Sequence, residues 1–193
     1  KRQEEKQEYM KIVSSNNELL LQLIDDILDL SKIEAGTMEF TFAPTDINEL
    51  MEGICRQMQE KNTSPDVAIT FTEKATECIF HTDRVRLSQV IINFTNNAMK
   101  FTSEGSIQMG YRIDETKDEI YFYVKDTGIG IPADKIDEVF ERFVKLNTFA
   151  KGTGLGLAIC RVIVERLEGT IGANSREGEG SCFWFRLPMH QKV

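Results

Sequence analysis

The stretch AKGTGLGLAICRVIVERLEG, residues 150–169, narrows the folds that this chain can adopt. Its glycines fall at Gly152, Gly154 and Gly156, and an apolar helical run follows them. A dinucleotide-binding loop instead has the spacing G-x-G-x-x-G, follows a strand and opens a helix. The residues before Gly152 are polar, so the sequence predicts a helix start without a strand in front. Free N–H groups and the helix dipole favour an anion at such a start.

Outward from this stretch, the hydrophobic pattern alternates between helical and strand periods. We expect helices at 47–61, 83–101 and 155–167, a short helix after the segment IPADK (131–135), and strands at 38–47, 66–73, 77–83, 105–114, 119–126, 169–175 and 180–188. The order is mixed, with several neighbouring strands antiparallel. These elements predict an α+β fold, a two-layer α/β sandwich with one sheet and helices on one face.

Residues 1–35 are expected to form one long helix that ends near Gly36. Its apolar positions step by four and three residues, as in a heptad seam: Tyr9, Val13, Asn16, Leu20, Leu23, Ile27 and Leu30. Such a helix needs partner helices, from a second copy of the chain or from a segment upstream. The alternative is a surface helix packed on its own domain. The predicted domains are therefore 1–36 and 37–193.

The charge balance limits the partners. A net charge of −8 argues against nucleic acid and anionic membranes as ligands. No apolar run reaches the roughly 18 residues that a membrane span needs. Because the chain opens KRQEEK without an initiator Met, we expect it to be part of a longer protein.

Two further segments carry candidate ligand-binding groups. On the helix 83–101, Asn93, Asn97 and Lys100 form a polar stripe; amide oxygens suit Mg²⁺, and a lysine one turn away suits phosphate. The alternative is a solvated polar face. Asp126 ends a strand and precedes Gly128 and Gly130, which permit close backbone approach. A carboxylate accepts from the adenine amino group and repels the guanine oxygen, so Asp126 predicts ATP over GTP. The alternative is a simple Asp-Gly turn.

Taken in order, the motifs are N-x-x-x-N-A-x-K-F-T (93–102), D-T-G-I-G-I (126–131), F-E-R-F (140–143) and G-T-G-L-G-L (152–157). This series resembles the ATP-binding catalytic domain of two-component sensor histidine kinases. Among these, the wording of the motifs in residues is most similar to that of hybrid sensor kinases. The resemblance covers about residues 37–188 and implies the Bergerat-type ATP-binding fold. The segment ending LLQLIDDILDLSKIEAG resembles the second helix of that family's dimerisation and phosphotransfer domain.

The resemblance also implies roles for single residues. Asn97 and Asn93 would hold Mg²⁺, Lys100 would contact phosphate, and Asp126 would accept from adenine. The residues expected to shape the pocket or border the phosphates are Gly128, Gly130, Ile131, Gly152, Thr153, Gly154, Leu155 and Gly156, with positive charge from Arg142, Lys145 and Lys151. The loop from Phe143 to Thr153 would form the lid over ATP, although Lys151 stands where the family usually has glycine.

The family phosphorylates a histidine on the first helix of its phosphotransfer domain. This chain has only His81, in a strand pattern, and His190, near the C-terminus, and neither has the expected neighbours. We therefore expect an acceptor histidine outside this chain, no autophosphorylation by the chain alone, and onward relay to a response regulator aspartate. By resemblance, the domain would be cytoplasmic, with any membrane anchor upstream.

Two other functions remain open from the sequence. Gyrase-type and chaperone-type ATPases share the fold but carry Glu where Asn93 stands, as a base that activates water. An amide cannot take up that proton, which favours transfer over hydrolysis. A degenerate domain that binds nucleotide only as a scaffold is the second alternative.

Overall fold

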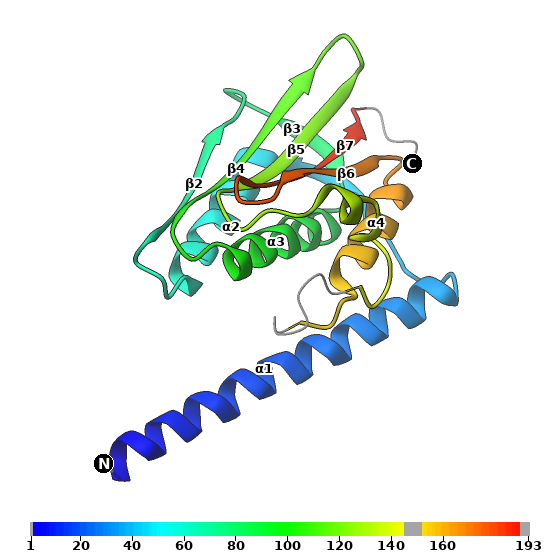
Figure 1. Cartoon of the computed structure of the whole chain (residues 1–193). Coiled ribbons are helices and arrows are strands. Elements are labelled where there is room, and N and C mark those ends of the chain that lie inside the picture. The colour runs from blue at the N-terminus through cyan, green and yellow to red at the C-terminus, as the bar shows by residue number, and fades with distance from the viewer. Residues whose placement is uncertain (1, 145–151, 190–193) are drawn as a thin grey trace.

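The long helix and the remainder of the chain form two parts in the computed structural model, which describes residues 2–144 and 152–189. Helix α1 (Arg2–Glu34) is a rod beside a compact domain that holds every other element (Figure 1). In chain order these are β1 (Ala43–Asp46), α2 (Ile47–Lys61), β2 (Val67–Glu73), β3 (Ile79–Thr82), α3 (Arg84–Phe101), β4 (Gly105–Asp114), β5 (Glu119–Asp126), the 3₁₀-helix η1 (Ala133–Glu138), α4 (Gly156–Arg166), β6 (Thr170–Arg176) and β7 (Gly180–Pro188).

Five of the strands form the main sheet, in the order β2-β4-β5-β7-β6. Strands β2 and β4 run parallel, and the other neighbouring pairs run antiparallel. Helices α2, α3 and α4 lie together on one face of this sheet (Figure 1). The predicted α+β two-layer sandwich is confirmed, because the sheet and the helices each bury one face against the other.

The expectation of a single sheet with a strand over 38–47 is wrong. Strands β1 and β3 pair with each other in a separate two-stranded sheet, and β1 begins only at Ala43. In the residues before it, the backbone N–H of Thr41 donates to the carboxylate of Asp83 (2.7 Å) instead of to a strand. The ring of Phe40 lies beneath the guanidinium of Arg86, 6.0 Å from the ring centroid. Contacts to the start of α3 therefore replace strand pairing.

Helix α3 is seated on the sheet by the apolar stripe that its sequence predicts. The stripe predicted from steps of four and three residues comprises Leu87, Ile91, Phe94, Ala98 and Phe101. The first four are at most 3% exposed, whereas Phe101 at the end of the helix is only partly buried. The ring of Phe94 lies between two rings of β7, with centroids 5.5 Å from Phe183 and 6.0 Å from Phe185. Asp83 caps the helix by accepting from the N–H of Arg86 (2.9 Å). The core thereby fixes which face α3 turns away from the sheet.

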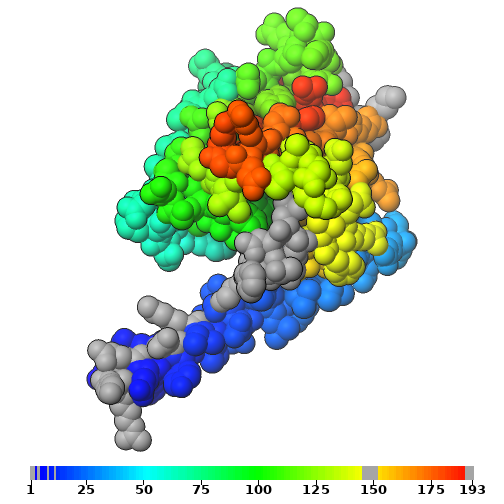
Figure 2. Space-filling model, viewed as in Figure 1, coloured from blue at the N-terminus to red at the C-terminus, as the bar shows by residue number. Residues whose placement is uncertain are grey.

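Among the residues that the structure describes, helix α1 packs on the domain through its C-terminal part, where Leu30 and Ile33 contact the core. Figure 2 shows the N-terminal part of this helix projecting from the domain. Between Tyr9 and Ile27 most apolar residues of the predicted seam are exposed, namely Tyr9 (69%), Val13 (58%), Leu20 (54%) and Ile27 (48%), whereas Leu23 is partly buried. Most of this apolar stripe of α1 is therefore not covered by other described residues. No helix among the described residues is long and apolar enough to cross a membrane.

The sheet face opposite the helices carries a row of aromatic rings. Tyr121 lies between Tyr123 and Trp184, with its ring centroid 6.0 Å from each. The ring of Tyr123 lies over Gly110 of β4, and that of Trp184 lies over Gly172 of β6, where an added Cβ would overlap each ring. Glycine at both positions therefore allows the rings to lie against the backbone of the neighbouring strand.

Candidate functional site

The polar stripe of α3 faces the glycine loop that precedes α4. The side-chain amide of Asn97 donates to the oxygen of Asn93 (3.3 Å), one turn earlier, so the two amides share a face as predicted. This bond uses one of the two N–H groups of the Asn97 amide, and the Asn97 oxygen takes no part in it. Lys100 extends the stripe, and a Cβ added at Gly152 would lie 2.8 Å from its Nζ.

Asp126 ends β5 as a buried carboxylate, 4% exposed. Its Oδ1 accepts from the backbone N–H groups of Gly128 (2.8 Å) and Ser181 (3.2 Å). Burial raises the pKa of Asp126, and these two hydrogen bonds lower it in part. Because both bonds go to Oδ1, Oδ2 is the oxygen left to accept from a ligand.

The loop after Asp126 is wedged between α3 and the β6–β7 hairpin (Figure 1). Gly130 has a positive φ of 69°, and a Cβ there would overlap the carbonyl of Arg176. The loop is held by its own backbone: Ile129 N–H donates to Phe101 O (3.2 Å), and Ile131 N–H donates to Ser175 Oγ (2.8 Å). Glycine is required where the loop passes the hairpin.

The second glycine loop closes on the same region from the other side. Gly156, the first residue of α4, lies against Asn93, so that an added Cβ would overlap the Asn93 amide. Gly154 accepts from Phe143 N–H (2.8 Å) and has a positive φ of 73°. Segments far apart in sequence, at 93–100 and 152–156, are thus brought together, while Asp126 to Ile131 form a neighbouring wall anchored on the end of α3.

Some of the basic residues predicted for the site lie away from it or outside the described residues. Arg142 is exposed and pairs with Glu34 of α1 (2.6 Å), so its charge is directed to the long helix. Lys145, Lys151, most of the expected lid and His190 lie outside the described residues. His81 of β3 pairs with Pro44 of β1 and stacks on Phe42, with centroids 6.2 Å apart. These contacts hold His81 in the two-stranded sheet, although its side chain is exposed.

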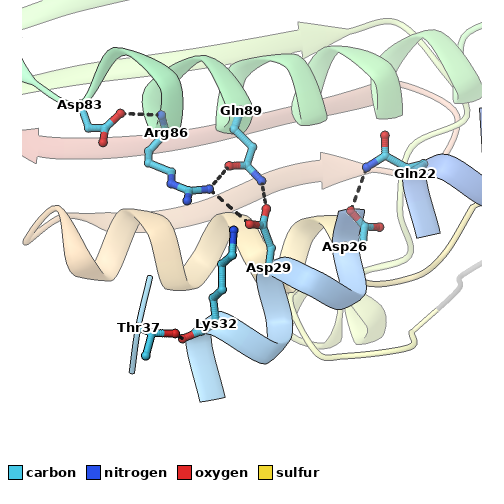
Figure 3. Close-up of polar contacts among 8 residues, drawn as sticks. All are labelled: Gln22, Asp26, Asp29, Lys32, Thr37, Asp83, Arg86 and Gln89. Carbon is cyan, nitrogen blue, oxygen red and sulfur yellow. Dashed lines mark hydrogen bonds and ion pairs between the residues drawn. The ribbon is translucent and has the colours of Figure 1, made fainter. Parts of the chain in front are cut away.

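Contacts from α1 to the site were not predicted from the sequence. Figure 3 shows Asp29 of α1 accepting from Arg86 Nη1 (3.4 Å) and Gln89 Nε2 (2.6 Å) at the start of α3. One turn earlier on the same helix, Asp26 is 4% exposed and accepts from Thr153 of the second glycine loop (2.5 Å). The signal in the sequence was two aspartates three residues apart, hence on one helix face, within the apolar segment LLLQLIDDILDL.

Ser175 and Ser181 were also missed as site residues. Ser175 Oγ lies 2.9 Å from Ser181 Oγ and donates to Gly180 O (2.9 Å), while accepting from the first glycine loop. Strand alternation places both serines on the face toward the helices, where an apolar residue would be expected. A hydroxyl at such a position was the available signal.

The described residues contain no cluster of three or more His, Cys, Asp or Glu that could hold a metal. A divalent ion at α3 would therefore need the amide oxygens of Asn93 and Asn97 together with ligand oxygens. Mg²⁺ is commonly bound this way, through few protein ligands, waters and substrate phosphates. The donor set on α3 fits a magnesium–phosphate complex.

Replacing Gly156 by Ala is expected to weaken binding of a magnesium–nucleotide complex about tenfold, the effect of disturbing one polar contact. The new methyl would displace the amide of Asn93, whereas the fold should persist because Ala is a better helix former than Gly. Calorimetric titration measures the effect. Gly53→Ala is the matched control, since its methyl would meet nothing within 4 Å. Unchanged binding in Gly156→Ala would show that Asn93 need not keep its position.

Comparison with known proteins gives one family match and many related chains. The family model for histidine kinase-, DNA gyrase B- and HSP90-like ATPases matches residues 82–191. Hybrid signal transduction histidine kinase K of Dictyostelium discoideum is 36% identical over 200 residues, which cover 94% of this chain and 16% of that protein. The circadian input-output histidine kinase CikA of Synechococcus elongatus is 36% identical over 192 residues, 96% of this chain and 25% of the relative. The chain thus spans a quarter or less of these two relatives.

Solved structures agree with the fold. Full-length ShkA in complex with AMPPNP superposes with a TM-score of 0.84 at 28% identity, over 98% of this chain and 40% of that one. Histidine kinase ThkA in complex with the response regulator protein TrrA gives a TM-score of 0.74 at 26% identity, over 94% of this chain and 51% of that one. Both similarities include helix α1, because they extend over nearly the whole chain.

Proposed function

This chain belongs to the family of histidine kinase-, DNA gyrase B- and HSP90-like ATPases, and from that premise we propose that it is the Mg²⁺–ATP-binding catalytic core of a sensor histidine kinase. The γ-phosphoryl group goes to a histidine outside residues 1–193 and then to a response regulator aspartate. The observation that carries this proposal is the convergence of the α3 amides and Lys100 on the second glycine loop, beside the buried acceptor Asp126.

Each group has a distinct task in the proposed site. Asp126 Oδ2 accepts from the adenine amino group, and the wedged loop from Gly128 to Ile131 shapes the pocket around the base. Lys100 and the N–H groups at the start of α4 hold the phosphates. Asn97 and Asn93 supply amide oxygens to Mg²⁺, which when bound neutralises the charge that develops on the transferred group.

Transfer is favoured over hydrolysis by the side chain at position 93. The Asn93 oxygen accepts from Asn97, and its nitrogen lies against Gly156. An amide in this place orients a ligand but cannot deprotonate water. This residue separates the proposed kinase core from the ATPase switches of the same family.

The remaining assignments follow from the open stripe of α1 and the relatives. We propose that residues 1–36 are the second helix of a dimerisation and phosphotransfer domain, that residues 37–193 are the catalytic domain, and that the exposed seam forms a homodimer. ThkA was solved with a response regulator, which supports a receiver domain as partner here. A cytoplasmic location is part of the same proposal.

Titration of the chain with a non-hydrolysable ATP analogue, with and without Mg²⁺, tests the core of the proposal. Wild type should bind more tightly with Mg²⁺. Asn97→Ala should lose this increment, about tenfold or more, and keep its affinity in the absence of the metal. The Mg²⁺ arm thus separates metal ligation from general damage to the pocket.

The other outcomes decide between the alternatives. Binding that Mg²⁺ does not change in wild type would contradict the amide-bound metal. No binding at all would contradict the proposed function and would favour a scaffold domain that has lost its nucleotide site. A second assay uses γ-labelled ATP: label appearing on this chain alone would contradict an acceptor histidine outside it, and phosphate released at the rate of nucleotide consumption would favour an ATPase.

A further inference from the structure

The carboxylate of Asp26 joins the long helix to the loop proposed to hold phosphate. It lies 127 positions from Thr153 in sequence, yet its Oδ2 accepts from the Thr153 hydroxyl at 2.5 Å. Its Oδ1 accepts from Gln22 of the preceding turn at 2.8 Å, as Figure 3 shows. With 4% of its surface exposed, Asp26 is enclosed between α1 and the catalytic domain.

Thr153 has a single proton to donate. Its oxygen accepts from the N–H of Leu155 (3.2 Å), and its proton is directed to Asp26. A hydroxyl provides one donor, so Thr153 cannot donate to Asp26 and to a phosphate oxygen at the same time. Phosphate binding that uses this hydroxyl must therefore break the contact with α1.

The negative charge of Asp26 also opposes phosphate binding at the second glycine loop. Thr153 stands between Gly152 and Gly154, in the loop whose N–H groups would receive a polyanion. Gly152 also borders Lys100. An enclosed carboxylate within hydrogen-bond reach of that loop repels a triphosphate, and the low local polarity strengthens the repulsion.

A second pair of contacts keeps Asp26 in place. Asp29 lies one turn further along α1 and holds Arg86 and Gln89 of α3 (Figure 3). The Arg86 and Asp29 side chains are only 16% and 17% exposed, so the ion pair is partly shielded from solvent. Helix α1 thus contacts both α3 and the glycine loop through two carboxylates that lie one turn apart on one face.

We propose that Asp26 couples docking of α1 negatively to phosphate binding: the docked helix lowers affinity for the triphosphate, and a bound triphosphate loosens the helix. This inference rests on the proposed function and adds a residue outside the nucleotide pocket that determines how strongly the phosphates are held. Coupling between two sites is reciprocal, so both effects have the same size.

The test compares affinities for a non-hydrolysable ATP analogue and for adenosine, both with Mg²⁺. Asp26→Asn keeps the shape and can still accept from Thr153, but it removes the charge. It should bind the analogue about tenfold more tightly, within the usual range of coupling between sites, and bind adenosine as wild type does. A purely structural role for Asp26 would not change the ratio of the two affinities.

Asp25→Asn is the matched control. It removes the same charge from the preceding residue of α1, whose side chain is exposed, so it should leave the ratio unchanged. A gain of similar size in Asp25→Asn, or unchanged or weaker analogue binding in Asp26→Asn, would overturn the coupling. If wild type binds neither adenosine nor the analogue, the proposed function itself is contradicted.

Hydrogen exchange on the wild-type chain tests the reciprocal effect without any substitution. The analogue should speed amide exchange in α1 around Asp26, whereas adenosine should not. Exchange that the analogue slows in this segment would show that phosphate strengthens docking, which contradicts the proposal.

Discussion

Asp126→Asn is expected to abolish measurable binding of an ATP analogue, a loss of at least about 100-fold. Two backbone N–H groups point at Oδ1, so the Asn oxygen must stay on them. The Asn nitrogen then takes the place of Oδ2 and directs a donor at the adenine amino group, which is itself a donor. Calorimetric titration measures the loss.

The same substitution should not destabilise the protein. Burial raises the pKa of Asp126 above its ordinary value of 3.8, so keeping it ionised costs the folded state stability at neutral pH. The folded state is therefore relatively more stable below the unfolded pKa of Asp126, where the carboxyl is protonated. This advantage is lost as pH rises through the folded pKa. Asp126→Asn removes this dependence, so its melting temperature at pH 7 should equal or exceed that of wild type.

The pH series supplies the control. The difference in melting temperature between Asp126→Asn and wild type should shrink as pH falls toward the unfolded pKa, because wild-type Asp126 then becomes neutral as well. Retained analogue binding in a stable variant would contradict the adenine role of Asp126. A variant that melts well below wild type at pH 7 would instead show that the charge itself stabilises the fold.

Phe94→Ala should cost about 3–5 kcal/mol in the free energy of unfolding, a large share of the roughly 5–15 kcal/mol that stabilises a typical domain. The Phe94 side chain has no exposed surface and packs on Phe183 and Phe185. Truncation leaves a cavity between α3 and β7 that rigid neighbours cannot fill. Urea unfolding measures the effect.

Phe94→Leu is the control for Phe94→Ala. It keeps most of the apolar volume and should cost clearly less, since a core tolerates hydrophobic exchange better than a void. Because Asn93 adjoins Phe94 on α3, Phe94→Ala should also weaken magnesium-dependent nucleotide binding. A loss below about 1 kcal/mol would contradict the tight seating of α3 on the sheet.

Local patterns predicted the elements that carry the site, and they did so for physical reasons. In α3 the burial of Leu87 and Ile91 leaves the face of Asn93 and Asn97 turned away from the sheet, because helical spacing separates the two stripes. Asp46 stands directly before α2, the usual place of a helix cap, and accepts from the N–H of Glu49 (3.1 Å). The two glycine loops could be recognised in the sequence only from their glycine-rich composition.

Contacts between distant polar residues could not be predicted in this way. Asp26 and Thr153 are fixed by how α1 packs on the domain, which no local period reports. The hydrogen bond from the N–H of Ile131 to Ser175 depends on how the β6–β7 hairpin lies against the first glycine loop. Thr41 does not join the expected strand, and its N–H donates instead to Asp83, the cap of α3. In each case tertiary packing decided the outcome.

The aromatic row on the open face of the sheet gives the protein a built-in optical reporter. Trp184 is the only tryptophan of the chain and lies against Tyr121, on the side away from α3 and α4. Its emission therefore follows the integrity of the β5–β7 pairing and is separated by the sheet from events on the helical side. Unfolding of every variant considered above can be followed through this one indole, without a label and without interference from the nucleotide loops.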